Sequence, residues 1–184
     1  MDWVAISIDS LNCETNLRMG RAIAGKKPLA LEYYKSVVSK VKDCGYGLKI
    51  NTVVNSHNLK EDMIEFIQFS KPKRWKILQA LPIKGQNDKW ISEMTVTDMQ
   101  FDDFIKRHQA ASESTTMVPE SNSEMKGSYV MVDPAGRFFD NTQGFHRYSR
   151  PILEIGVEEA FKEVEYDNQK FKSRGGIYEW MVIR

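Results

Sequence analysis

The chain has 184 residues, of which 41% are hydrophobic, 11% aromatic and 28% charged, and this composition excludes a wholly disordered chain. Its 26 Lys and Arg residues are nearly balanced by 25 Asp and Glu residues, and a net charge of +1 argues against a nucleic-acid binder. The two cysteines, Cys13 and Cys44, fit no zinc spacing and are too few for a disulfide-dense scaffold. We therefore expect a single structural domain from a reducing, cytoplasmic compartment.

The amino-terminal segment has none of the features of a targeting signal. It is acidic at Asp2 and Asp9, whereas a secretory signal begins with basic residues and carries a longer apolar stretch. No segment approaches the roughly 20 apolar residues that cross a bilayer. We expect no membrane segment, and a strand that begins directly at Trp3.

The first half of the sequence alternates predicted strands and helices. The strands are predicted at residues 3–8, 48–54 and 75–83, and the helices at residues 28–43 and 58–70. Gly45 is a stop signal for the first helix, and Asn55, Ser56 and Asn58 are candidate caps of the second. Strand, helix and strand with short connections are typical of right-handed βαβ units. The predicted fold class is therefore α/β with a parallel sheet.

The second half is less regular. Residues 84–94 are polar and predict a loop, and residues 97–110 predict a short helix with Thr97 as its N-cap. Residues 111–116 predict a connector, and short strands are predicted at residues 117–118, 129–132 and 137–139. A turn at residues 133–136 joins the last two strands, and a short helix is predicted at residues 157–161.

Polar side chains share one face of the predicted strands. Side chains two positions apart in a strand point to the same side. The polar face then carries Ser7, Lys49 with Asn51, and Arg74 with Lys76. A parallel sheet covered by helices on both faces is apolar on both, so a polar face favours a barrel interior that opens into a binding site.

Three cations on these strands, Lys49, Arg74 and Lys76, suit a polyphosphate if they converge. Each positive charge offsets one phosphate charge, and Arg adds bidentate geometry. The alternative is that they are strand-end residues in contact with solvent, which is the commoner position for Lys and Arg. From these residues alone, both interpretations stay open.

No other local pattern predicts a site. The stretch from Gly20 to Lys27 lacks the spacing of a phosphate-binding loop. The histidines His57, His108 and His146 are scattered without metal-ligand spacing, so we expect them at the surface or in helix caps. No Ser/His/Asp or Cys/His arrangement can be nominated from the spacing.

A series of different short motifs extends along almost the full chain. The motifs are Ser7-Ile8-Asp9-Ser10, Gly20-Arg21, Lys49-Ile50-Asn51, Arg74-Trp75-Lys76, Val118-Pro119-Glu120-Ser121-Asn122, Ser128-Tyr129, Gly156-Val157-Glu158-Glu159-Ala160, and Arg174-Gly175-Gly176 with Tyr178 and Trp180. The series resembles the viperin family, the radical S-adenosylmethionine nucleotide dehydratases of antiviral defence. No single motif is decisive, and the resemblance depends on their joint order and spacing.

The resemblance implies a fold and a reaction. The fold is the C-terminal part of a partial (βα)6 radical S-adenosylmethionine barrel, with residues 1–83 as its second half. Residues 84–184 would supply the remaining barrel elements and an irregular C-terminal extension that covers the substrate. The family uses a 4Fe–4S cluster, an electron donor and S-adenosylmethionine to generate a 5′-deoxyadenosyl radical. A nucleoside triphosphate such as CTP then becomes its 3′-deoxy-3′,4′-didehydro analogue.

The resemblance also implies roles for individual residues. Ser7 and Arg21 match positions that bind S-adenosylmethionine, and Arg21 suits its carboxylate. The positions that match the nucleoside triphosphate site are Lys49, Asn51, Arg74, Lys76, Tyr129, His146 and Arg147. His146 or Arg147 replaces a lysine of the family, which leaves the base preference open.

The family's cluster loop is the main departure. Three cysteines in a C-x3-C-x2-C pattern hold the cluster, and neither Cys13 nor Cys44 matches one of them. The resemblance thus implies a C-terminal portion, inactive alone, whose barrel is completed by a missing amino-terminal half or another chain. The alternative function is a catalytically inactive module that binds nucleoside triphosphates or another protein.

Overall fold

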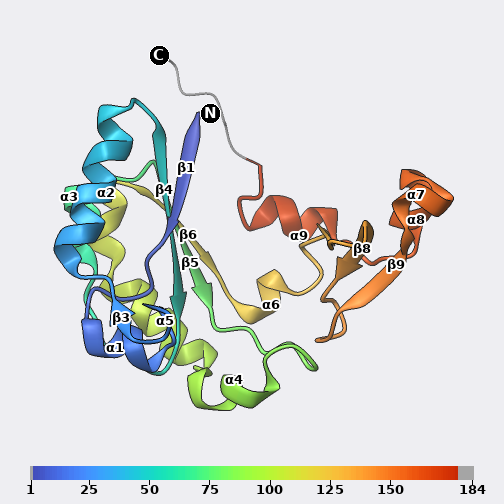
Figure 1. The fold of residues 1–184 in the computed structure, drawn as a ribbon, viewed down its shortest axis with the longest axis horizontal. Helices are drawn as coiled ribbons and strands as arrows, with labels where there is room; N and C mark the ends of the chain where they lie inside the picture. The colour runs from blue at the N-terminus through green and yellow to red at the C-terminus, as the bar shows by residue number, and fades with distance from the viewer. Residues whose placement is uncertain (1, 178–184) are drawn as a thin grey trace. The chain divides into compact units, whose positions relative to one another are not determined.

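The computed structural model describes residues 2–177. They form two compact units, one of residues 2–80 and 96–119 and the other of residues 81–95 and 120–177 (Figure 1). The predicted single domain, with its division after residue 83, stays a prediction. The motif residues Tyr178 and Trp180 lie outside the described residues.

The first unit contains a four-stranded sheet. Its strands, in spatial order, are β1 (Trp3–Ser7), β4 (Gly47–Val54), β5 (Arg74–Gln79) and β6 (Thr116–Glu120). The β1–β4 and β4–β5 pairs are parallel. Parallel pairs need crossover connections, which here contain helices. The predicted α/β class with a parallel sheet is therefore confirmed.

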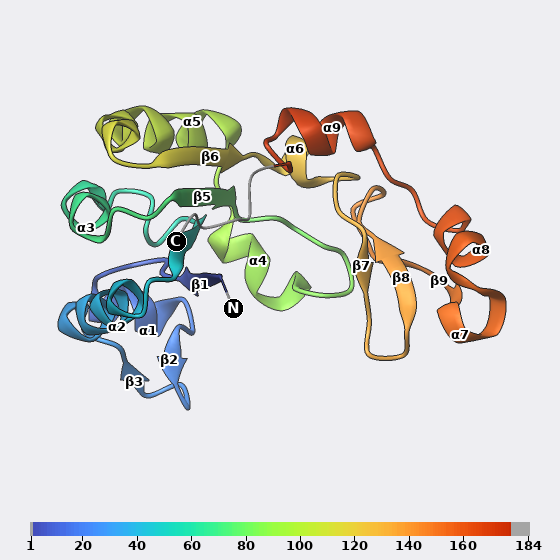
Figure 2. The same cartoon turned by 90° about the horizontal axis from the view of Figure 1, so that it is seen from above.

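The helices of this unit cover one side of the sheet (Figures 1 and 2). They are α2 (Leu31–Asp43), α3 (Ile64–Ser70) and α5 (Asp98–Arg107), with the smaller α1 (Cys13–Arg18) and the 3-10 turn η1 (Gln109–Glu113). Gly45, at φ 72°, follows the end of α2 as predicted. Thr97 caps α5 through a capping box with Gln100, also as predicted.

The predicted helices at residues 28–43 and 58–70 both begin too early. The first begins only at Leu31, because β3 (Lys27–Pro28) pairs with β2 (Ala22–Ile23) in a small antiparallel hairpin. The second begins only at Ile64, because the Asn58 side chain closes a loop. That amide accepts from the Asn55 N–H and donates to the carbonyl oxygens of Asp9 and Val53.

Two expectations at residues 75–94 are wrong. The strand ends at Gln79, and the predicted loop at 84–94 contains the helix α4 (Asp88–Met94) of the second unit. The Asn87 amide explains the change, because it accepts from the Ile83 N–H and donates to the Leu81 carbonyl, which turns the chain before the helix.

The second unit contains an antiparallel sheet of β7 (Met131–Val132), β8 (Arg137–Asp140) and β9 (Arg147–Pro151). The predicted turn lies between the first two, with the Gly136 N–H bonded to the Asp133 carbonyl. The short helices of the unit, besides α4, are α6 (Asn122–Met125), α7 (Ile152–Ile155), α8 (Val157–Lys162) and α9 (Asn168–Ser173). Among the described residues, no helix is long and apolar enough to span a bilayer.

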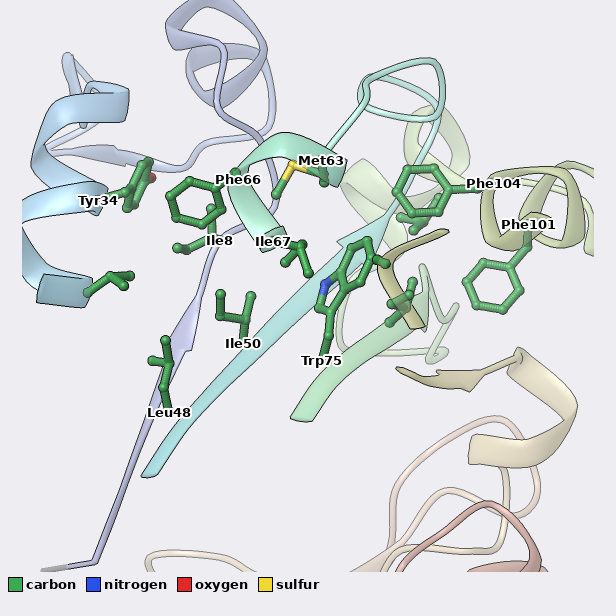
Figure 3. Close-up of a cluster of buried hydrophobic side chains, with 14 of the residues drawn as sticks. Ile8, Tyr34, Leu48, Ile50, Met63, Phe66, Ile67, Trp75, Phe101 and Phe104 are labelled. Atoms are coloured by element: carbon green, nitrogen blue, oxygen red, sulfur yellow. The ribbon is translucent and has the colours of Figure 1, made fainter. Parts of the chain in front are cut away.

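The main core lies between the first sheet and its helices, as Figure 3 shows. Ile50 and Trp75 project from the sheet, and Phe66 and Phe104 project from the helices into the same layer. All four side chains are buried, so their apolar area holds the two layers together. This packing fixes the strands that carry the predicted polar face.

His108 belongs to this core, so of its two predicted positions, the surface and a helix cap, the surface is wrong and the cap is confirmed. It is the C-cap residue of α5, and its ring stacks on Phe104 and meets Trp75 edge-on. The Met63 N–H donates to Nε2 at 3.0 Å, and Nδ1 lies 2.7 Å from the Phe104 carbonyl oxygen. These partners assign the neutral tautomer with its proton on Nδ1.

We expect His108 to make the free energy of unfolding depend on pH. Burial lowers the pKa of His108 below its usual value of 6.5. The unfolded chain therefore binds a proton at a higher pH than the folded chain does, and stability is lost as the pH falls through 6.5. Urea unfolding at pH 7 and pH 5 should show a smaller difference in His108→Gln than in the wild type. An equal difference in the two proteins, with His57→Gln as control, contradicts this role.

Candidate functional site

The parallel register aligns the predicted polar residues in two rows. One row is Ala5, Lys49 and Arg74, and the other is Ser7, Asn51 and Lys76. Register neighbours in adjacent strands point to the same side of a sheet. The three predicted cations therefore share one face, across two adjacent strands.

This face lies opposite the helix-covered core. Its residues alternate along β4 and β5 with Ile50 and Trp75, which are both fully buried. Ser7 is exposed, whereas Lys49, Asn51 and Lys76 are half-buried. The Asn51 Oδ1 atom is buried and has no hydrogen-bond partner among the described residues. The polar face thus offers an amide oxygen beside concentrated positive charge, which suits a ligand with both phosphate and donor groups.

Ser7 also lines a pocket beside β1, the edge strand of the sheet. The pocket has a volume of about 410 Å³, and Arg21 and Tyr34 also line it. The rest of its lining is mainly apolar, including Ile6 and Leu29. A pocket with apolar walls and few convergent polar groups is typical of a small-molecule site.

Local structure holds Arg21 at this pocket. The residue lies between the end of α1 and the β2–β3 hairpin, and its N–H donates to the Asn16 carbonyl at 2.7 Å. Its Nε donates to the Asp9 carboxylate at 2.5 Å. The predicted S-adenosylmethionine residues, Ser7 and Arg21, therefore line the same pocket. Burial and the charge of Asp9 raise the pKa of Tyr34 in this pocket.

Tyr129, in the second unit, belongs to a buried polar network. Its hydroxyl donates to Glu120 Oε2 at 2.5 Å and accepts from Arg174 Nη1 at 3.1 Å. Arg174 also pairs with Glu120 Oε1 at 2.8 Å and lies 4.0 Å from the centre of the tyrosine ring. The ion pair is almost completely buried, so it fixes the position of the tyrosine rigidly.

His146 and Arg147 occupy a more open position in the same unit. The His146 ring packs against Phe139 and lies 3.4 Å from the Tyr148 hydroxyl through its Nδ1 atom. Arg147 is half-exposed and pairs with Glu165 at 3.0 Å. Their assignment to the triphosphate site stays a prediction.

Three residues around these sites were missed as individual candidates. Asp9, Glu120 and Arg174 all occur inside the motif series, but the sequence gives no sign of what each one contacts. The partner of Asp9 is twelve residues away, and that of Arg174 is 54 residues away. A signal was available for Asp9, because strand parity puts it on the same face as Ser7.

The described residues offer no place for an iron–sulfur cluster. Among residues 2–177, no three His, Cys, Asp or Glu side chains are grouped as metal ligands. The sequence has two cysteines, and both Cys13 and Cys44 are free and exposed. Three thiolates are needed to hold a cluster with one open iron, so the donor set of this chain does not fit.

Comparison with known proteins identifies the relatives. No family model matches the chain. The chain is 56% identical over 180 residues to an S-adenosylmethionine-dependent nucleotide dehydratase of Lacinutrix mariniflava and 44% identical over 180 residues to one of Flammeovirga pacifica. It is 39% identical over 185 residues to the S-adenosylmethionine-dependent nucleotide dehydratase RSAD2 of Danio rerio.

These matches cover nearly all of the chain but only part of each relative. Each takes in 98% of this chain, against 37%, 61% and 50% of the three relatives in turn. The motif series had predicted both the family and the partial coverage. The chain is therefore similar, over nearly all of its length, to S-adenosylmethionine-dependent nucleotide dehydratases, and it spans 37% to 61% of the length of these three relatives.

Proposed function

We propose that this chain is the ligand-binding portion of a radical S-adenosylmethionine enzyme that dehydrates a nucleoside triphosphate for antiviral defence. In this proposal the four-stranded sheet is part of a (βα)6 barrel whose polar face lines the interior. The substrate is CTP-like, and the product is its 3′-deoxy-3′,4′-didehydro analogue.

The observation that carries the proposal is the position of Ser7. It stands in register with Asn51 and Lys76 on the cationic face, and it also lines the pocket that contains Arg21. The two predicted ligands would therefore lie next to each other within one compact unit. A hydrogen transfer between two bound molecules needs this proximity, because the reacting atoms must come within about 3–3.5 Å.

The cations of the sheet would bind the triphosphate. Lys49 and Arg74 stand side by side in register, and Lys76 follows two positions along β5. Together they offset most of the charge of a triphosphate, and the planar guanidinium of Arg74 adds directional hydrogen bonds. Asn51 would orient the nucleotide through its buried amide oxygen, which accepts a donor group.

The pocket beside β1 would hold S-adenosylmethionine. Arg21 suits the carboxylate, Ser7 offers a hydroxyl, and the apolar walls suit the uncharged parts of the molecule. When bound, S-adenosylmethionine supplies the radical that removes a hydrogen atom from the nucleotide. The residues of this chain orient the two ligands and exclude water from the contact between them.

The iron–sulfur cluster would depend on residues other than those of this chain. The donor set of the described residues does not fit the cluster. The proposal therefore includes a further protein segment that carries the cluster, and an electron donor. The roles of Tyr129, His146 and Arg147 toward the nucleotide are part of the proposal and depend on the family resemblance.

Calorimetric titration of the chain with CTP and with cytidine tests the proposed function. We expect CTP to bind at least about a hundredfold more tightly, because charge-assisted contacts to the phosphates supply most of the affinity. The preference should weaken as the salt concentration rises. Equal affinity for CTP and cytidine, or no binding of CTP, contradicts the proposal.

A further inference from the structure

Asp9 lies two residues after the end of β1, beside the neighbouring strand β4. Only 6% of the residue is exposed. Its Oδ1 atom accepts from the Val53 N–H at 2.8 Å, and its Oδ2 atom accepts from Arg21 Nε at 2.5 Å. Its own backbone carbonyl accepts from the Asn58 amide at 2.7 Å. Hydrogen bonds from three residues, Val53, Arg21 and Asn58, therefore hold Asp9 in place.

Among the described residues, the guanidinium of Arg21 is held through one of its three nitrogens. Its Nε atom is committed to Asp9, whereas its two terminal nitrogens have no hydrogen-bond partner among residues 2–177. Half of the side chain is exposed, and it lines the pocket shared with Ser7. A guanidinium with its Nε anchored and its terminal nitrogens open presents a fork that matches a carboxylate.

We propose that Asp9 is a positioning residue, which aims the terminal nitrogens of Arg21 at the carboxylate of S-adenosylmethionine. This inference rests on the proposed function and adds a residue to it. Asp9 does not touch the ligand; it acts through Arg21.

The geometry gives a reason for this arrangement. An arginine side chain has many rotamers, and ordering it at the moment of binding costs free energy. The anchored Nε atom restricts these rotamers before the ligand arrives. The buried carboxylate in turn needs a positive partner, and Arg21 supplies it. The pair therefore stays in one arrangement in the free protein.

A purely structural role for Asp9 is the competing explanation, and the substitution Asp9→Asn separates the two. An asparagine keeps an oxygen that accepts from Val53, so the contact between the strands survives. Its NH2 group, however, faces the Nε–H of Arg21, and two donors repel each other. The substitution should release Arg21 while it leaves the fold in place.

The experiment compares S-adenosylmethionine with its decarboxylated analogue, which differs only in the group that Arg21 is proposed to bind. Calorimetric titration of Asp9→Asn should show about tenfold weaker binding of S-adenosylmethionine and at most about a twofold change for the analogue. In an Arg21→Gln background, the Asp9→Asn change should not weaken the binding of S-adenosylmethionine any further, because the two residues act as one unit.

The controls address folding and general effects of charge. Thermal unfolding followed by circular dichroism reports whether Asp9→Asn folds. If it does not, Asp9→Glu is used, which keeps the negative charge but shifts the guanidinium by one methylene group. Asp133→Asn removes a similar Asp–Arg pair, with Arg137 at 2.6 Å, and should leave both affinities unchanged.

The outcomes separate this inference from the proposed function. If the wild type binds S-adenosylmethionine and Asp9→Asn binds it equally well, the positioning role is overturned and the pocket assignment stands. An equal loss for both ligands also overturns it, because the effect then has nothing to do with the carboxylate. If the wild type binds neither CTP nor S-adenosylmethionine, the proposed function fails, and the inference fails with it.

Discussion

Replacement of both Lys49 and Lys76 by methionine is expected to weaken CTP binding by about a hundredfold. The two lysines belong to neighbouring rows of the polar face, and each is half-buried, so solvent screens their charges only in part. Loss of one charge-assisted contact to a phosphate costs about 1.5–3 kcal/mol, which is at least tenfold in affinity. Calorimetric titration of the double variant with CTP measures the effect. Methionine keeps a flexible, unbranched side chain of similar size and removes the ammonium group with its charge and its donors.

Lys60→Met with Lys106→Met is the matched control for this experiment. Both lysines are exposed, and they line a different pocket on the outer surface of the same unit. The control changes the net charge by the same amount, so it measures the general electrostatic contribution. If both double variants lose CTP affinity equally, the polar face is not a specific phosphate site.

The polar face could be predicted because it depends only on short-range rules. The alternation of side chains along a strand put Ser7, Lys49 and Arg74 on one side without any structure, and the parallel register then set them in rows. The sheet class followed in the same way from the spacing of strands and helices. The strand pattern does not say whether such cations meet a ligand, so from these residues alone both interpretations stay open.

The polar networks could not be predicted, because they join residues that are distant in the chain. Asp9 and Arg21 meet only after α1 has turned the chain back, and Glu120 and Arg174 meet across most of the second unit. The prediction of the start of α3 failed for a related reason, because the Asn58 side chain bonds the backbone of Asp9, which is far away in sequence. Helical periodicity carries no information about such side-chain bonds.

The short elements of the second unit also escaped prediction. α6 and α7 have four residues each, too few for an apolar period to appear. β9 is rich in polar residues, and its strand form follows from pairing with β8 rather than from its own composition. The turn at Asp133 and Gly136, in contrast, carries its own signal in residue type, and it was found.

The second large effect is expected in the buried ion pair of Glu120 and Arg174. The substitution Glu120→Gln should lower the free energy of unfolding by about 3–5 kcal/mol, because it leaves the Arg174 charge buried without a counter-charge. The Tyr129 hydroxyl would also lose its charged acceptor. Urea unfolding, followed by near-ultraviolet circular dichroism, measures the change.

Three further variants, Arg174→Met, the double variant and an exposed-pair control, show whether the loss arises from the unpaired charge. Arg174→Met combined with Glu120→Gln removes both charges, so it should destabilise the chain less than the sum of the two single changes. Glu163→Gln breaks the exposed pair with Arg150 and should lower the free energy of unfolding far less, because solvent already screens that pair. Strict additivity of the two changes in the buried pair would mean that Glu120 and Arg174 act independently. Tyr129 would then be held by packing against the Arg174 guanidinium rather than by the charge network.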